Sequence, residues 1–283
     1  MTGKRKLTVL MIGMALVAVV AAAGCGSTAA SGNLSLSGST TVQPIAQEAA
    51  DQFMKKNPGA NVTVQGGGSS VGITNVSQGV SNIGNSSRNL ADTEKNLGLV
   101  DHQVAYDIVV AIVNPDVTVK SLTGDQMKNV FLGTVTNWSQ VGGSNAPITV
   151  MIRDEASGTR DMWDTTVLGK TATNPVKPVT GAIEANSNGL LRQKVASTPN
   201  SIGYISYGYM NKSVKALQFN GVTGNLTTGL NKTYPLTRYL HMFTKGAATG
   251  LAKTYIDFVL SPDFQNQTVS KDYVPMTKIS AQK

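Results

Sequence analysis

Apolar positions along the chain alternate between short strand-like runs and longer helical patterns. In residues 34–36 leucines alternate with serine, which is typical of a strand. After a polar turn, apolar residues recur at helical spacing over 45–54, and Pro58-Gly59 marks the end of that helix. Residues 61–80 repeat the order, with a strand, a glycine-rich turn and a short helix over 71–80. The N-terminal part therefore predicts an α/β fold built from strand–turn–helix units.

Two β-rich runs, 104–115 and 234–243, are longer than ordinary strands. We interpret them as segments that pass from one lobe of the molecule to another. They predict a two-lobed α/β fold with the ligand cleft between lobe I (34–109 plus 235–283) and lobe II (110–234). The middle of the chain predicts a helix over 122–131 capped by Thr123, a strand over 148–152, helices over 161–168 and 188–197, and a strand ending at 206. Short strands and loops are expected over 211–231. A helix over 251–260 and a last helix from Pro262 follow, and the ordered chain is expected to end at 273–276.

The N-terminus predicts export. Three basic residues, Lys4, Arg5 and Lys6, precede an apolar run over 7–23 that ends in small residues just before Cys25. This arrangement resembles a lipoprotein signal, so we expect residues 1–24 to be a signal peptide, Cys25 to be lipidated and 25–33 to form a tether. The protein would then lie outside the cytoplasm, anchored as a lipoprotein to the outer face of the cell membrane. A single-span anchor is the alternative, although 17 residues is at the short limit for a span.

Composition narrows the possible functions. The net charge is +8, and removal of residues 1–24 deletes three positive and no negative charges, which leaves +5. This basic charge favours anionic partners, but no Lys/Arg run supports nucleic-acid binding. Cys25 is the only cysteine, so the chain can form no internal disulfide and no cysteine metal site. The sequence shows no metal cluster, P-loop or dinucleotide fingerprint, and we expect no cofactor and no metal.

Polar turns that follow predicted strands are the candidate functional features. The most informative is Ser157-Gly158-Thr159, which lies between a buried strand and a helix and follows Arg153 by four residues. The first N–H groups of a helix lack partners and attract anions, and a guanidinium supplies a planar pair of donors to an oxyanion. One such turn is commonly a simple helix cap. Comparable turns, however, occur at Gly38–Thr41, Gly66–Ser70 and Ser86–Arg88. Together they favour a site for a small tetrahedral anion.

In this order the four motifs resemble those of the phosphate-binding lipoproteins of phosphate-specific ABC transporters, which have the type II periplasmic binding protein fold. The resemblance covers nearly the whole chain after the signal and extends to Ser201–Tyr204. It implies a monomeric, non-enzymatic binding protein that captures inorganic phosphate by hinge closure and delivers it to ABC permease subunits. The phosphate-binding residues it implies are Ser39, Thr40, Thr41, Ser69, Ser70, Ser87, Arg88, Arg153, Ser157, Gly158 and Thr159.

One position departs from the family. Some members have an aspartate where this chain has Ser87, and that carboxylate accepts a proton from the bound phosphate. A carboxylate only accepts hydrogen bonds, so it favours a protonated oxyanion over sulfate. Ser87 can accept a hydrogen bond but carries no charge. The resemblance therefore leaves sulfate, molybdate and tungstate open as alternative ligands.

A serine hydrolase is the alternative from a different functional class. Residues 68–72 match G-x-S-x-G between a strand and a helix, which would make Ser70 the nucleophile. The base would have to be His102 or His241, the only histidines. His102 lies in a polar stretch typical of a surface, and His241 lies in an apolar strand typical of a core. The motif is short, and its confirmation requires a histidine in hydrogen-bond reach of the serine.

Overall fold

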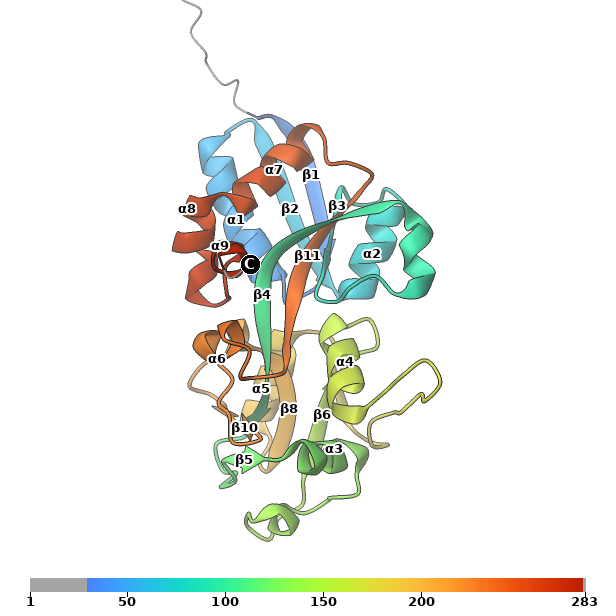
Figure 1. Cartoon of the computed structure of the whole chain (residues 1–283), viewed down its shortest axis with the longest axis vertical. Helices are drawn as coiled ribbons and strands as arrows, with labels where there is room; N and C mark the ends of the chain where they lie inside the picture. The colour runs from blue at the N-terminus through green and yellow to red at the C-terminus, as the bar shows by residue number, and fades with distance from the viewer. Residues whose placement is uncertain (1–29, 282–283) are drawn as a thin grey trace, which may run out of the picture.

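The computed structural model describes residues 30–281, and its main sheet extends through both halves of the elongated molecule (Figure 1). The sheet has nine strands in the order β2-β1-β3-β11-β4-β8-β6-β7, with β9 paired to β4. Residues 1–29, which include Cys25, the predicted signal peptide and most of the predicted tether, lie outside the described part. The main strands are β1 (Gly32–Gly38), β2 (Ala60–Gly67), β3 (Ile83–Ser86), β4 (Leu99–Val113), β6 (Thr149–Arg153), β7 (Ile183–Ala185), β8 (Ser201–Ser206), β9 (Lys215–Ala216) and β11 (Thr237–Lys245).

The two predicted long β segments are confirmed as β4 and β11. They pair antiparallel from Thr237↔Ile108 to Lys245↔Leu99 and cross from one half of the molecule to the other (Figure 1). We call the half with β1, β2 and β3 the first lobe and the half with β6, β7 and β8 the second lobe. A small sheet of β5 (Ser121–Leu122) and β10 (Gln218–Phe219) belongs to the second lobe.

Helices cover both lobes, and each lobe has its own large apolar core. In the first lobe, the buried face of α1 includes Ala46, Ala49 and Phe53, and Phe53 packs edge-on against Tyr255 at 5.5 Å between ring centroids. In the second lobe, Trp163 stacks on Tyr204 at 4.4 Å. The helices are α1 (Gln43–Lys56), α2 (Ser69–Ser77), α3 (Gly124–Leu132), α4 (Gly158–Trp163), α5 (Asn188–Ser197), α6 (Leu226–Leu230), α7 (Gly250–Leu260), α8 (Pro262–Gln267) and α9 (Met276–Ser280).

Most of the predicted helices are confirmed, and two regions differ. The helix over 188–197 is α5, and Thr123 caps α3 by accepting from the N–H of Gln126. Strands and loops alone were expected over 211–231, but α6 forms there with Asn225 as its cap. The ordered chain was expected to end near Met276, but α9 begins at that residue. The prediction was wrong because Pro275 stands in an extended conformation at the N-cap of a further short helix.

Five shorter helical turns complete the described chain. Four are 3₁₀ turns and one, η3, is a π-helical turn that continues α4. No helix among residues 30–281 is long and apolar enough to cross a membrane. The turns are η1 (Asp92–Leu97), η2 (Trp138–Val141), η3 (Asp164–Leu168), η4 (Tyr207–Tyr209) and η5 (Val269–Lys271).

Candidate functional site

The starts of α1 and α2 in the first lobe meet the starts of α4 and α5 in the second. Thr41 Oγ1, just before α1, lies 3.1 Å from Thr159 Oγ1 in α4. The amide of Asn188, the first residue of α5, donates to Thr41 Oγ1 at 3.0 Å. The N–H of Ser70 in α2 donates to the carbonyl of Ala156 at 3.1 Å. The starts of four helices, where the positive ends of the helix dipoles lie, therefore surround one region between the lobes.

We call the side chains at this meeting point the interlobe cluster. All of its members are buried, and the four polar turns in the sequence supply all of them except Arg153. The cluster consists of Thr40, Thr41, Ser69, Ser87, Arg153, Ser157, Gly158 and Thr159. Eight of the eleven residues predicted from the sequence are thus brought together.

Arg153 is the fixed cation of the interlobe cluster. It ends β6, and only 1% of its surface is exposed. Its Nε donates to the carbonyl of Ala185 at 3.1 Å, and Nη2 donates to the carbonyl of Asn186 at 3.2 Å. Nη1 is buried and has no hydrogen-bond partner among the described residues. Burial lowers the pKa of Arg153, while the neighbouring Asp154 raises it. The side chain is thus a positioned cation with a free donor, which an anion would satisfy.

Close contact between the lobes depends on two glycines. Gly68, the N-cap of α2, has φ +93°, which favours glycine, and a Cβ there would lie 2.6 Å from the carbonyl oxygen of Ala156. A Cβ at Gly158 would lie 2.4 Å from Ser69 Oγ and 2.8 Å from Ser87 Oγ. Any larger residue at either position would hold the two lobes further apart.

The hydroxyl of Ser157 accepts hydrogen bonds that cap α4, and its own O–H remains available as a donor. Its Oγ accepts from the N–H groups of Thr159 and Arg160, both at 3.2 Å, and so caps α4. A hydroxyl that accepts these bonds still has its own O–H to donate. Ser157 can therefore stabilise the turn and contact a ligand at the same time.

Arg238 and Asp107 belong to the same region but were not predicted from the sequence. They face each other on β11 and β4, and Arg238 donates to Asp107 Oδ2 from Nη2 at 2.9 Å and from Nε at 3.1 Å. Arg238 Nη1 donates to the carbonyl of Gly158 at 3.0 Å, and Nη2 donates to Thr159 Oγ1 at 2.9 Å and to Thr41 Oγ1 at 3.3 Å. One arginine on a crossing strand therefore contacts both lobes.

Asp107 holds this arginine in place from a fully buried position. Its other oxygen accepts from Ser206 Oγ at 2.6 Å. Burial raises the pKa of Asp107, and the charge of Arg238 acts against that rise. The sequence did contain one sign of this ion pair, because Asp107 and Arg238 are charged residues within the two long apolar runs.

Asn188 and Tyr209 were also missed. The side-chain oxygen of Asn188 accepts from the N–H of Ser206 at 3.1 Å, which orients its amide toward Thr40 and Thr41. The hydroxyl of Tyr209 donates to the carbonyl of Thr40. Burial raises the pKa of Tyr209 to about 12, so the hydroxyl keeps its proton at neutral pH. Asn188 lies in a Ser-Asn-Gly turn between β7 and α5, which was a signal that the sequence offered, whereas Tyr209 lies in no such turn.

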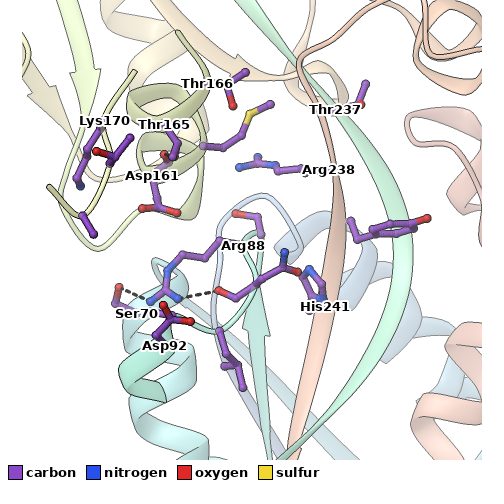
Figure 2. A pocket seen from close by; sticks show the side chains of 18 of the residues that line it. Ser70, Arg88, Asp92, Asp161, Thr165, Thr166, Lys170, Thr237, Arg238 and His241 are labelled. Carbon is purple, nitrogen blue, oxygen red and sulfur yellow. Dashed lines mark hydrogen bonds between the residues drawn. The ribbon is translucent and has the colours of Figure 1, made fainter. Parts of the chain in front are cut away.

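The other three predicted site residues lie beside the interlobe cluster. Ser39 Oγ accepts from the N–H of Thr41 at 3.1 Å and so shapes the turn before α1. Arg88 donates to both carboxylate oxygens of Glu94, at 2.6 and 2.8 Å. It also donates to Ser70 Oγ at 3.1 Å (Figure 2). Because Glu94 already neutralises Arg88, these residues form an edge of the region rather than its centre.

A cavity of about 870 Å³, which we call the side cavity, adjoins the interlobe cluster. Figure 2 shows Arg88, Arg238, Thr166 and Asp161 around it. Ser87 and Arg238 line the side cavity and also contact the cluster, the first through Ser69 and the second through Thr159.

The described residues provide no hydrolase geometry. His241 Nδ1 lies 2.8 Å from a carboxylate oxygen of Asp101, and His102 Nε2 lies 3.1 Å from Thr244 Oγ1. The hydroxyl of Ser70 accepts from Arg88 and hydrogen-bonds neither histidine. Within residues 30–281, no group of His, Cys, Asp and Glu side chains is arranged to hold a metal.

Comparisons with known proteins agree on one kind of relative. Residues 23–263 match the family model described as a PBP superfamily domain. The phosphate-binding protein PstS of Bacillus subtilis (strain 168) is 37% identical over 293 residues, which cover 97% of this chain and 95% of that protein.

Solved structures give the same result. A putative phosphate ABC transporter substrate-binding protein with bound phosphate, from Clostridium perfringens, is 35% identical with a TM-score of 0.81, covering 86% of this chain and 99% of that one. An ABC-type phosphate transport receptor from Vibrio cholerae is 31% identical with a TM-score of 0.71, covering 86% of this chain and 100% of that one. The predicted two-lobed α/β fold of the type II periplasmic binding proteins is therefore confirmed.

Proposed function

This chain belongs to the PstS family of phosphate-binding proteins, and from that premise we propose that it captures inorganic phosphate between its two lobes and delivers it to the permease subunits of an ABC importer. Proteins of this family bind a solute without transforming it, so the chain is a binding protein and not an enzyme. Inorganic phosphate is the ligand named for its relatives and present in one of their structures.

The buried, unpaired Nη1 of Arg153 is the observation that carries the ligand assignment. A buried donor with no acceptor is costly, and this one belongs to a cation beside four helix starts. A small oxyanion removes that cost and neutralises the charge.

Each lobe would supply one wall of the phosphate site. In the first lobe, Thr40, Thr41, Ser69 and Ser87 offer hydroxyl donors, and the start of α2 offers main-chain N–H groups. In the second lobe, the donors would be Arg153, Ser157, Gly158 and Thr159. Asn188 and Arg238 join both walls through Thr41. We assign Ser39, Ser70 and Arg88 to the support of these walls.

Phosphate capture would be coupled to a hinge motion of the two lobes about β4 and β11. The lobes already touch at Ser70 and Ala156, where the main-chain bond is 3.1 Å long. In the closed form the cluster is sealed from water, which strengthens each charge-assisted bond. Opening would break this bond and expose the hydroxyl groups to solvent.

The protein functions outside the cytoplasm, as do related binding proteins. We further propose that it is a monomer held at the outer face of the membrane by a lipid on Cys25. A Cys25→Ser variant should then be released from the membrane into the surrounding fluid while it keeps its phosphate affinity. Retention on the membrane would contradict lipidation at Cys25.

Calorimetric titration tests the ligand assignment. The chain without residues 1–24, stripped of ligand and carrying Cys25→Ser, would be titrated with phosphate and, in parallel, with sulfate, molybdate and tungstate. Tight phosphate binding with no response to sulfate is the expected result. A response to another oxyanion but not to phosphate would overturn the ligand and keep the binding function.

A further inference from the structure

Tyr209 links the two lobes through a main-chain carbonyl. Its hydroxyl, in η4 of the second lobe, donates to the carbonyl of Thr40, in the turn before α1 of the first lobe. Other side chains of the second lobe reach this turn through the threonine hydroxyls, which the proposed site assigns to phosphate. Tyr209 uses the main chain instead, so it does not compete with an anion for those hydroxyls.

The carbonyl of Thr40 has no donor from its own helix. Pro44 stands four residues later, in the first turn of α1, and proline lacks the N–H that a helix would supply at that position. Within residues 30–281 the hydroxyl of Tyr209 is the one hydrogen-bond donor to this carbonyl. Thr40 is only 6% exposed, so without Tyr209 its carbonyl would be a buried acceptor with no partner.

The second lobe holds Tyr209 in place independently of the first. The carbonyl of Tyr209 accepts from Arg192 Nη1 at 2.8 Å, and η4 follows directly after β8, whose residues are all buried. Burial raises the pKa of the Tyr209 hydroxyl to about 12, so it remains a donor at neutral pH. Tyr209 is therefore a preformed donor that a movement of the lobes would bring to the Thr40 carbonyl or take away from it.

The neighbouring carbonyl, that of Thr41, is bonded from its own lobe. It accepts from the hydroxyl of Tyr273 at 3.0 Å, and Tyr273 belongs to the apolar core of the first lobe. This bond would stay intact when the lobes separate, whereas the bond from Tyr209 would break. The turn before α1 therefore has one carbonyl tied to each lobe.

From this geometry we propose that Tyr209 is a positioning residue that latches the closed form and sets the lifetime of bound phosphate. The latch makes no contact with the anion. It forms when the second lobe reaches the turn before α1, and the lobes cannot separate until it breaks. The inference rests on the proposed function, because a latch acts only if the lobes open and close around phosphate.

Tyr209→Phe tests the latch, because it removes the hydroxyl and keeps the ring. In the open form the Thr40 carbonyl can bond to water, but in the closed form of the variant it stays unpaired, so only the closed form is penalised. The dissociation rate would be measured with radiolabelled phosphate chased by unlabelled phosphate. It should rise by about 5- to 150-fold, while the association rate stays within about twofold, because the anion meets the open form first.

The matched control is Tyr255→Phe. It removes another buried tyrosine hydroxyl that donates to a main-chain carbonyl, that of Ala46, at 2.6 Å. Both partners lie in the first lobe, in α7 and α1, so the loss favours neither the open nor the closed form. Tyr255→Phe should lower the melting temperature and leave the phosphate dissociation rate within about twofold of that of the unaltered protein.

The outcomes separate the two proposals. An unchanged dissociation rate in Tyr209→Phe would overturn the latch and leave the proposed function intact. Equal acceleration in both variants would overturn the latch too, since a general loss of stability would then explain both. Slower association in place of faster dissociation would also overturn it, because Tyr209 would then shape the open form. Failure of the unaltered protein to bind phosphate would refute the proposed function, and the latch with it.

Discussion

Replacement of Arg153 by alanine is the most direct test of the phosphate site. The change removes a buried cation whose Nη1 has no partner in the described structure. It leaves the neighbouring hydroxyl and N–H donors in place. The loss of phosphate affinity therefore reports mainly on the guanidinium.

The expected loss follows from the number of free donors. Nη1 carries two N–H groups, and a hydrogen bond to a charged partner contributes about 1.5 to 3 kcal/mol. Two such bonds give about 3 to 6 kcal/mol, which corresponds to a weakening of roughly 10² to 10⁴ in the dissociation constant. The variant also leaves the carbonyls of Ala185 and Asn186 without this partner, so it should lose thermal stability in the absence of ligand.

The matched control is Lys177→Ala, which makes the same change in net charge at an exposed position of the second lobe. Both variants would be titrated with phosphate at two salt concentrations, to separate long-range attraction from direct contact. Lys177→Ala should stay within about twofold of the unaltered protein. If Arg153→Ala also stayed within that range while remaining folded, Arg153 would not be a ligand, and the argument from its unpaired nitrogen would fail.

Three further predictions concern closure, the buried ion pair and pH. Gly68→Ala should weaken phosphate binding by about 5- to 150-fold in a titration, because its Cβ meets the other lobe, whereas Gly79→Ala, also at positive φ but with open space around it, should bind normally. Asp107→Asn should lower the free energy of unfolding by about 3 to 5 kcal/mol in urea, since it leaves a buried guanidinium unpaired, and an unchanged midpoint would contradict this. Arg88 holds the pKa of Glu94 below its ordinary value of 4.5, so this carboxylate stabilises the fold above that pH, and the stabilisation is lost as the pH falls through the lowered value. Glu94→Gln should therefore cost less than about 1 kcal/mol at pH 7 and less at pH 3 than at pH 7 in thermal unfolding, and an equal loss at both pH values would refute the assignment.

The sequence pattern predicted most helices, the two long strands and the polar turns at helix starts, because these depend on residues close together in the chain. The turns at Thr40, Ser69 and Ser157 each follow the carboxyl end of a strand, so their helix starts were expected to line the cleft between the two lobes. Partner choice was harder to predict. Arg88 could have faced a ligand, but the 3₁₀ turn after it brings Glu94 within 2.6 Å. The spacing of apolar residues does not predict this 3₁₀ turn, so it could not predict the Arg88–Glu94 ion pair.

The contacts that were missed depend on strand register between distant parts of the chain. Asp107 and Arg238 are 131 residues apart in sequence, and their pairing follows from the alignment of β4 with β11. A shift by one residue would place each side chain on the other face of the sheet. Periodicity identifies both segments as strands but does not fix this register, so the sequence could not reveal the pair.

The position of the Asp107–Arg238 ion pair explains how anion binding and lobe closure can be coupled. Asp107 fixes Arg238 on the strands that join the lobes, so the guanidinium can keep its place while the lobes move. The same guanidinium reaches Thr41 in the first lobe and Thr159 in the second. A ligand shifts a conformational equilibrium only when it binds one state better than the other. An anion that contacts both threonine turns would meet this condition, because the two turns belong to different lobes and this structure brings them together around Arg238.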